Sequence, residues 1–66
     1  MKVTINGKEE TLADGISVKA FLDSKDINAN VVACELNLNV LRRKELPNVI
    51  LKEGDTLEII RMIGGG

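Results

Sequence analysis

The sequence predicts an α+β domain in which one helix covers one face of a mixed sheet of four to five strands. Three observations lead to this fold class: an alternating hairpin near the start, one amphipathic helical stretch after it, and two apolar strand-like stretches in the second half. A sheet face and the apolar stripe of a helix each need apolar cover, and here each covers the other. At 66 residues the chain has the size of one domain.

The first element is a β-hairpin. In "KVTI" the apolar residues Val3 and Ile5 alternate with polar ones, which is the strand period. Asn6-Gly7 follows, and this pair is a strong hairpin signal because both central positions of the turn need positive φ. We expect "KEETL" to be the return strand. A two-residue turn places three of its residues on the face of Val3 and Ile5, namely Lys8, Glu10 and Leu12. The tip of the hairpin is therefore expected to project beyond whatever covers that face.

The second element is the helix. Ser17 is a good N-cap, because its hydroxyl can accept a hydrogen bond from a free N–H of the first turn. Val18, Phe21 and Leu22 are spaced i, i+3 and i+4 and form one apolar face. The spacing predicts a helix from about Ser17 to Lys25, short enough to depend on packing for its stability.

The second half predicts strands separated by irregular structure. The stretch from Val31 to Leu36 is apolar on both parities, as in a central strand. Pro47 cannot donate to a strand ladder, so we expect an irregular crossing with a short helical turn from about Arg42 to Leu46. A turn over Lys52–Asp55 then leads into the last strand, Thr56–Ile63. This order of elements, β-β-α-β, a crossing and β, favours the ubiquitin-like β-grasp fold.

Composition excludes several classes of function. The chain has 9 basic and 10 acidic residues and 2% aromatics, which argues against nucleic acid as a partner because phosphate binding needs a basic patch and base stacking needs rings. One cysteine and no histidine leave no zinc set and no internal disulfide. No apolar run approaches the ~20 residues of a membrane span, and the start lacks the apolar stretch of a signal peptide. With a free thiol, the expectation is a protein of the reducing cytoplasm that does not bind membranes.

The last strand separates into two faces. Leu57 and Ile59 share the face expected under the helix, so Glu58, Ile60 and Met62 should face solvent. Exposed apolar residues are common on any protein surface. Two of them on the strand that leads into the glycines instead favour a partner-docking patch.

Three glycines, Gly64, Gly65 and Gly66, close the sequence. We expect a β-grasp domain at residues 1–63 and a flexible glycine tail at residues 64–66. Extended, the tail spans about 10 Å, and without Cβ atoms it can thread a channel too narrow for other residues. Gly66 would then offer an α-carboxylate that an ATP-using enzyme can convert to an acyl-adenylate. The alternative is a frayed end or a cloning scar.

Several stretches together resemble the ThiS family, the ubiquitin-like sulfur carriers of thiamine biosynthesis, along the whole chain. They are "VTING", "DGISVKAFL", "VACELN", "LKEGDTLEI" and the closing "GG". The resemblance implies that an E1-like adenylyltransferase (ThiF type) uses ATP and Mg to adenylate Gly66. Sulfur originating from cysteine would then give a C-terminal thiocarboxylate, which thiazole synthase (ThiG type) uses. The chain itself would bind no cofactor and would not be an enzyme.

The resemblance also assigns residues. Gly65 and Gly66 match the terminal pair, with Gly66 as the modified residue and Gly64 extending the run. The resemblance further assigns a docking patch, formed by Ile60, Met62 and Ile63. The chain departs from the family in two places: Asn37-Leu38 stands where Asn-Gly is common, and Leu41-Arg42 stands where Pro-Arg is common. These departures put the local loop geometry in question.

Two other features have simple structural interpretations. Cys34 lies in an apolar strand with no histidine or basic cluster to activate it, so we expect it to pack as a small hydrophobic residue. The basic run Arg42, Arg43 and Lys44 fits a solvated loop, with contact to an acidic partner surface as the alternative.

Two other functions also agree with the sequence, and a third is disfavoured. One is a sulfur carrier of another pathway, such as the small subunit of molybdopterin synthase or a carrier for cysteine, methionine or tRNA thiolation. The absence of proline from "EIIRMIGGG" favours the thiamine branch. Another is a ubiquitin-like binding module that acts by contact alone. An enzyme is disfavoured because the sequence offers no histidine, no acid/base pair and no phosphate-binding loop.

Overall fold

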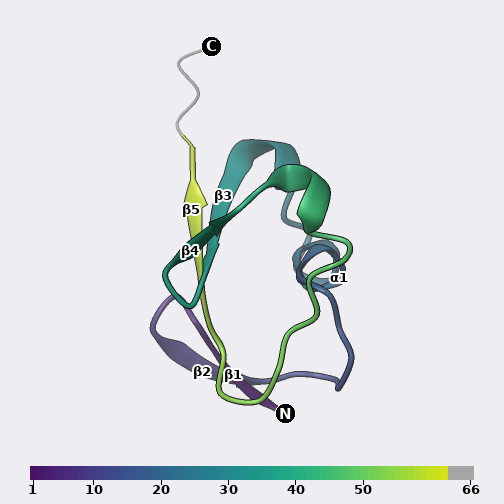
Figure 1. Cartoon of the computed structure of the whole chain (residues 1–66), viewed down its shortest axis with the longest axis vertical. Coiled ribbons are helices and arrows are strands. Elements are labelled where there is room, and N and C mark those ends of the chain that lie inside the picture. The colour runs from purple at the N-terminus through teal and green to yellow at the C-terminus, as the bar shows by residue number, and fades with distance from the viewer. Residues whose placement is uncertain (63–66) are drawn as a thin grey trace.

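A computed structural model describes residues 1–62, which form a five-stranded sheet with one α-helix on one face (Figure 1). The strands are β1 (Lys2–Ile5), β2 (Lys8–Thr11), β3 (Val32–Leu36), β4 (Asn39–Leu41) and β5 (Thr56–Arg61). Their order across the sheet is β2-β1-β5-β3-β4, with β1 and β5 parallel and the other pairs antiparallel. The predicted mixed sheet with one covering helix is confirmed.

The hairpin of β1 and β2 has the predicted register. Ile5 lies opposite Lys8, and the two turn residues have positive φ, 49° at Asn6 and 83° at Gly7. Lys8 is exposed at the tip, as expected. Glu10 does not project beyond the helix, however: its Oε1 lies 3.2 Å from Nζ of Lys25 at the helix end. The hairpin is therefore joined to the helix by an ion pair as well as by the core.

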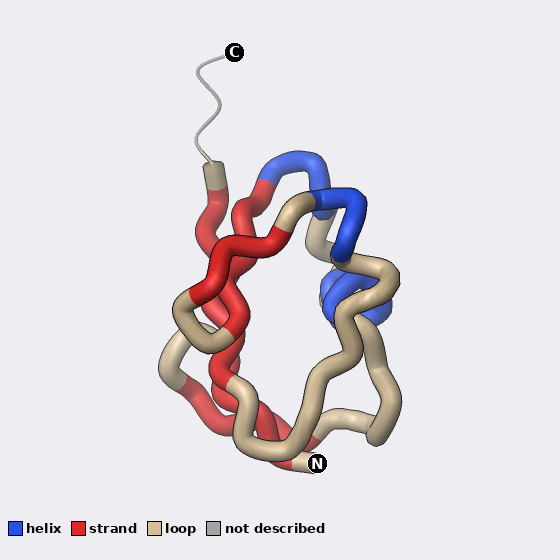
Figure 2. Tube along the Cα trace, in the orientation of Figure 1, coloured by secondary structure: helices blue, strands red, loops and turns tan. Residues whose placement is uncertain are grey.

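The helix α1 (Val18–Ser24) is one residue shorter at each end than predicted, with Ser17 as the predicted N-cap and Lys25 as the C-cap. Oγ of Ser17 accepts a hydrogen bond from the backbone N–H of Ala20 at 3.0 Å. Val18, Phe21 and Leu22 are buried against the sheet, and Figure 2 shows the helix on one side of the strands. With a single helix of this length, packing of these three side chains supplies most of the helix stability.

One strand, β4, was not predicted from the sequence, and it lies in the segment after the helix. A 3-10 turn η1 (Ala29–Val31) precedes β3, so Val31 lies just outside the strand in which it was expected. The turn after β3 is built by Asn37 and Leu38, with φ of 51° and 72°, and β4 follows it. Because that turn lacks glycine, β4 had no sequence signal of the usual kind. The predicted helical turn is confirmed as the 3-10 turn η2 (Arg43–Glu45).

The chain then returns along the helix side of the molecule. The N–H of Val18 donates to the carbonyl of Val49, and the N–H of Leu51 donates to the carbonyl of Ile16, both at 2.9 Å. This short pairing closes the core beside the helix. The turn at Lys52–Asp55 is present, with a positive φ of 85° at Gly54.

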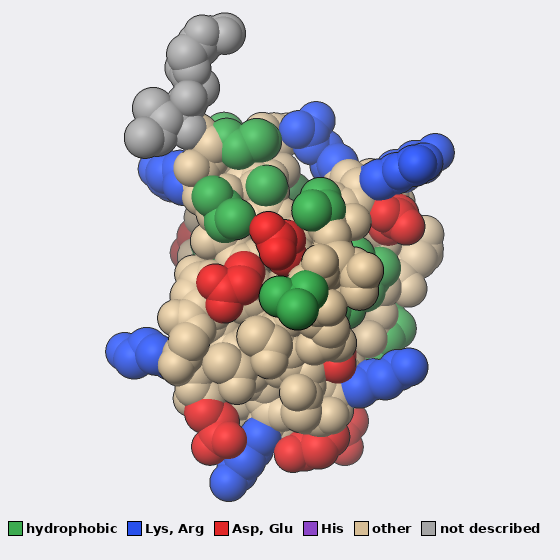
Figure 3. All heavy atoms as spheres, turned by 60° about the vertical axis from the view of Figure 1, so that its left-hand side comes forward, with side chains coloured by type: hydrophobic (Ala, Val, Ile, Leu, Met, Phe, Trp, Pro, Cys, Tyr) green, Lys and Arg blue, Asp and Glu red, His purple; other side chains and the backbone are tan. Residues whose placement is uncertain are grey.

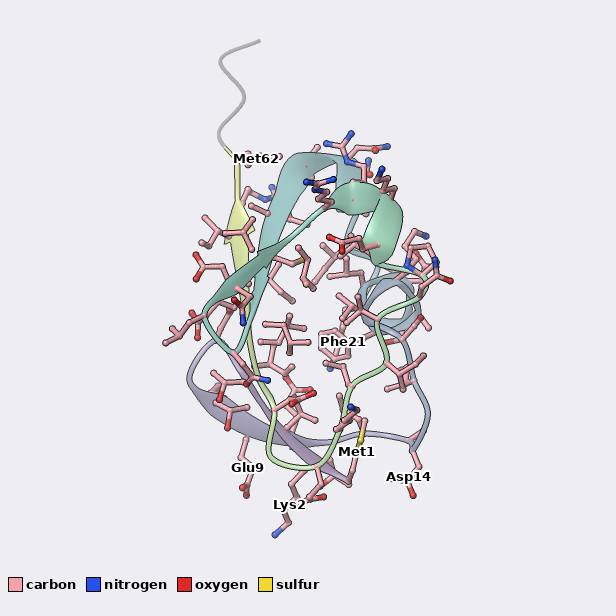
Figure 4. All side chains as sticks on the ribbon, in the orientation of Figure 1. Met1, Lys2, Glu9, Asp14, Phe21 and Met62 are labelled. Atoms are coloured by element: carbon pink, nitrogen blue, oxygen red, sulfur yellow. The ribbon has the colours of Figure 1, made fainter. Side chains whose placement is uncertain are left out.

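The core lies between the helix, this returning segment and the inner face of the sheet. Its buried residues are Val3, Ile5, Val18, Phe21, Leu22, Ala29, Val32, Cys34, Leu46, Leu51 and Leu57. Figure 4 shows Phe21 among the side chains that fill this space. Since β5 is the central strand and contributes Leu57, the strand that leads to the glycines is anchored at the middle of the fold.

Candidate functional site

The two faces of β5 differ as the alternation predicts. Leu57 is completely buried under the helix, and Ile59 packs against the core. On the other face, 49% of Ile60 and 44% of Met62 are exposed. The predicted exposure of these two residues is confirmed. We call the sheet face opposite the helix the outer face.

Backbone pairing extends to the last described residue. β5 is bound on one side by β1 and on the other by β3, where Arg61 lies opposite Val32. The N–H of Met62 then donates to the carbonyl of Val31 at 2.9 Å. Figure 4 shows Met62 at the end of β5, at the opposite end of the molecule from Met1. The domain thus holds the approach to the glycines in a fixed direction up to residue 62.

The remaining predicted site residues lie outside the described residues. These are Ile63, which belongs to the predicted docking patch, and the three tail residues Gly64, Gly65 and Gly66. The predicted division between residues 1–63 and 64–66 falls in the same stretch. Their roles stay predictions.

The outer face carries further residues that sequence reasoning missed. Val40 of β4 lies opposite Glu35 of β3, and Glu35 lies opposite Glu58 of β5, so these three form one row across the strands. Val40 is 70% exposed and both glutamates are half-buried. Figure 3 shows hydrophobic side chains around acidic ones on this side of the molecule. The missing signals were the register of β3 against β5, which places Glu35 beside Glu58, and the register of β4 against β3, which places Val40 beside Glu35.

The β3–β4 turn is fixed by the side chain of Asn37. Its Nδ2 donates to Oδ1 of Asp55 at 3.0 Å, and its Oδ1 accepts from the backbone N–H of Thr56 at 2.9 Å. Leu38 follows it and is 90% exposed. The departure at Asn37-Leu38 therefore preserves a tight two-residue turn but places an aliphatic side chain in solvent at its tip.

Cys34 packs in the core as predicted. Only 2% of its surface is exposed, and burial raises the pKa of its thiol. A buried neutral thiol is a poor nucleophile because the thiolate is the reactive form. This geometry gives Cys34 a packing role.

The basic run lies at the end of the molecule where β5 finishes. Arg42, Arg43 and Lys44 are exposed in and beside η2, which Figure 1 shows in green at the same end as the last residues of β5. Among residues 1–62, the recorded ion pairs involve none of the three. The solvated-loop interpretation and the acidic-partner interpretation both agree with this placement.

The described residues provide no site for a metal ion. Across residues 1–62 no three His, Cys, Asp or Glu side chains converge closely enough to hold one. None of the helices in this part of the chain is long and apolar enough to cross a membrane.

The sequence and fold match known proteins along the whole chain. Residues 3–66 match the ThiS family. A crystal structure of a thiamine biosynthesis protein (ThiS) from Geobacter metallireducens is 35% identical, covers 100% of both chains and superposes with a TM-score of 0.87. An NMR structure of a thiamine biosynthesis protein from that organism is also 35% identical and superposes with a TM-score of 0.81, covering 100% of this chain and 88% of the other.

Longer relatives match as well. A thiazole synthase from Paramagnetospirillum magneticum is 36% identical over 66 residues, and another from Magnetococcus marinus is 32% identical. The match takes in 100% of this chain but 20% of each of those proteins, so the chain spans about a fifth of their length. The uncharacterized protein ycf40 of Porphyra purpurea is 27% identical, with 93% of its length covered. The match over residues 3–66, together with the superposed fold, shows that the chain belongs to the ThiS family of ubiquitin-like β-grasp proteins.

Proposed function

We propose that this protein is the sulfur carrier of thiamine biosynthesis, with the carboxylate of Gly66 as the group that carries sulfur. The observation that carries the proposal is the full-length match to the ThiS family, joined to a structural neighbour described as a thiamine biosynthesis protein. The fold supports it, because the central strand β5 leads directly toward the glycines.

The chemistry divides into activation and sulfur transfer. A carboxylate is a weak electrophile, so an E1-like adenylyltransferase joins it to the α-phosphate of ATP, with Mg bound in that enzyme, and pyrophosphate leaves. Sulfur at the oxidation level of sulfide, supplied as hydrosulfide by a cysteine-dependent donor, attacks the acyl carbon; a C–S bond forms, the bond to the phosphate oxygen breaks and AMP leaves. The product is a thiocarboxylate in which sulfur replaces one oxygen of Gly66. Thiazole synthase then accepts that sulfur.

In these steps the chain presents its C-terminal carboxylate and docks on the partner enzymes, and it contributes no catalytic group. Gly64 and Gly65 form a thread without Cβ atoms that enters the partner's active site. The docking patch, Ile60, Met62 and Ile63, contacts the partner beside the entrance. Because β5 is held by β1 and β3, docking at Ile60 and Met62 sets the direction from which the tail enters. We propose that these steps take place in the cytoplasm, where ATP is available to the partner enzymes.

Intact-mass spectrometry tests the proposal. The protein is incubated with the adenylyltransferase, MgATP and a sulfur donor, and the C-terminal peptide should gain the mass difference between sulfur and oxygen. Deletion of Gly66 or addition of one residue after it should abolish the gain and leave the melting temperature unchanged. Lys8→Ala, an exposed change at the far hairpin tip, is the matched control and should still be converted.

An unchanged mass with an adenylyltransferase that converts another carrier would contradict the proposal. That result would favour a binding module that acts by contact alone. Conversion of Gly66 without sulfur transfer to thiazole synthase would instead assign the carrier to another pathway.

A further inference from the structure

The outer face of β3, β4 and β5 bears a set of residues that no partner within the described chain covers. Exposed apolar side chains lie at Leu38 and Val40, at 90% and 70%, and at Ile60 and Met62. Glu35 and Glu58 lie between them. We call these six residues the outer surface. It continues from the docking patch to the opposite end of the sheet.

Leu38 occupies a backbone conformation that its residue type disfavours. Its φ is 72°, where Cβ crowds the following carbonyl, and glycine or asparagine would fit with less strain. Burial of the side chain does not offset this strain, because Leu38 is 90% exposed. The hydrogen bonds of Asn37 to Asp55 and Thr56 hold the turn in this form. Folding alone therefore gives no reason for leucine at this position.

Glu35 and Glu58 form a second unfavourable arrangement. They lie directly opposite on neighbouring antiparallel strands, where like charges destabilise a sheet. Within residues 1–62, four of the other eight acidic side chains have a recorded cationic partner, among them Glu10 with Lys25 and Asp23 with Lys19. Figure 4 shows two further pairs, Met1–Asp14 and Lys2–Glu9, at the end away from Met62. Within residues 1–62 the recorded ion pairs do not include Glu35 or Glu58.

The two features meet at one place on the surface. An open hollow of about 460 Å³ is lined by Leu38 and Glu58, together with Asn37 and Thr56. Figure 3 shows the acidic side chains of this side surrounded by hydrophobic ones. Local choices that weaken the fold without a structural return are expected at functional sites. Here the strained Leu38 and the like-charged pair of Glu35 and Glu58 lie in the same area of the surface.

The chemistry of the area defines its occupant. Apolar side chains around two carboxylates fit a protein surface that is apolar and brings one cationic side chain. An arginine suits this position, because its guanidinium can bind two carboxylates through charge-assisted hydrogen bonds. Such a contact would relieve the repulsion between Glu35 and Glu58.

We propose that the outer surface is the binding site for thiazole synthase, with Leu38 as an anchor at the β3–β4 turn and Glu35 and Glu58 receiving a basic side chain of the synthase. The choice of synthase rests on the proposed function and on two relatives named thiazole synthase, which contain a region matching this whole chain. A domain of this type is thus joined to such a protein in those relatives. The contact extends docking from Ile60 and Met62 across the rest of the outer surface, on β3, β4 and their turn.

Substitutions at Leu38 separate folding from binding. Leu38→Gly relieves the backbone strain and should raise the melting temperature by about 4 °C, while removal of the anchor should raise the Kd for purified thiazole synthase about tenfold. Leu38→Asn keeps a Cβ and also tolerates positive φ, so it should weaken binding without lowering the melting temperature. Calorimetric titration and thermal unfolding measure the two quantities.

Substitutions at Glu58 test the charge. Glu58→Lys creates an opposite-charge pair with Glu35 and should raise the melting temperature, yet it should weaken binding more than Glu58→Gln does. The affinity of the unmodified protein should fall as salt increases, and that dependence should be smaller for Glu58→Gln.

Ile50→Thr is the matched control, because Ile50 is 43% exposed but pairs with Ser17 on the helix side. It should leave the Kd unchanged. Unchanged Kd values for the Leu38 and Glu58 variants would overturn the proposal. So would an unmodified protein that forms the thiocarboxylate but does not bind thiazole synthase, a result that leaves sulfur carriage standing and assigns the carrier to another pathway. Failure to form the thiocarboxylate, with synthase binding intact, would overturn the carrier function alone.

Discussion

Cys34 packs in the core and takes no part in the sulfur chemistry proposed for the tail. It is buried on β3, and burial raises the pKa of its thiol. We predict that native protein reacts with a thiol reagent only as fast as it unfolds, because both access and the thiolate are lacking. Labelling followed by absorbance, with and without urea, measures this. Rapid labelling of the native protein would contradict it.

The same pKa shift sets the sign of a pH dependence. In the unfolded chain the thiol ionises near its ordinary pKa, whereas burial raises the pKa of Cys34 in the folded protein, which keeps the proton to higher pH. The contribution of Cys34 to the free energy of unfolding is therefore complete below the unfolded pKa and declines as pH rises through the folded pKa. Comparison with Cys34→Ala, which cannot ionise, isolates this decline.

At the scale of the element, the start of α1 depends on one hydroxyl. Ser17 accepts from the N–H of Ala20, and a helix of 7 residues has little stability of its own. Ser17→Ala should lower the free energy of unfolding by about 1 kcal/mol. Ser24→Ala is the control, because Oγ of exposed Ser24 donates to the carbonyl of Phe21 and caps no N–H. Urea denaturation should show little change for Ser24→Ala. Equal effects of the two changes would argue against the cap.

The strand β5 makes a second prediction at this scale, because its two faces have different tasks. Ile60→Asp changes a half-exposed side chain on the outer face and should weaken partner docking while the protein still unfolds cooperatively. Leu57→Asp places a charge at a completely buried position and should abolish folding. Circular dichroism and the rate of thiocarboxylate formation report the two effects. Unchanged docking for Ile60→Asp would remove Ile60 from the docking patch.

The stability of the whole molecule depends on one small core between the helix and the sheet. Phe21 is the chain's single aromatic residue and is 1% exposed. Phe21→Ala should cost about 3–5 kcal/mol, which is comparable to the total stability expected of a core in a chain this short. We predict that this variant is largely unfolded at 25 °C, whereas Phe21→Leu, which fills most of the space, stays folded. A cooperative thermal transition for Phe21→Ala near that of the unmodified protein would contradict the prediction.

Local signals account for the parts of the fold that were predicted correctly. Asn6-Gly7 specifies its turn through positive φ, and Ser17, Val18 and Phe21 specify the helix through a cap and a spacing, all within a few residues. The exposure of Ile60 and Met62 followed from alternation along one strand. The strand β4 was missed because Asn37 and Leu38 form its turn without glycine.

By itself, the sequence determined the fold class, the helix, the first hairpin and the two faces of the last strand, because each depends on neighbours in the chain. Tertiary structure alone decided which distant residues meet across the sheet. Strand register placed Glu35 against Glu58 and Val40 beside them, and the hydrogen bonds of Asn37 to Asp55 and Thr56 held Leu38 outward. Pairing between strands far apart in sequence is set by the shared core and not by any one segment, so these contacts had no local signature.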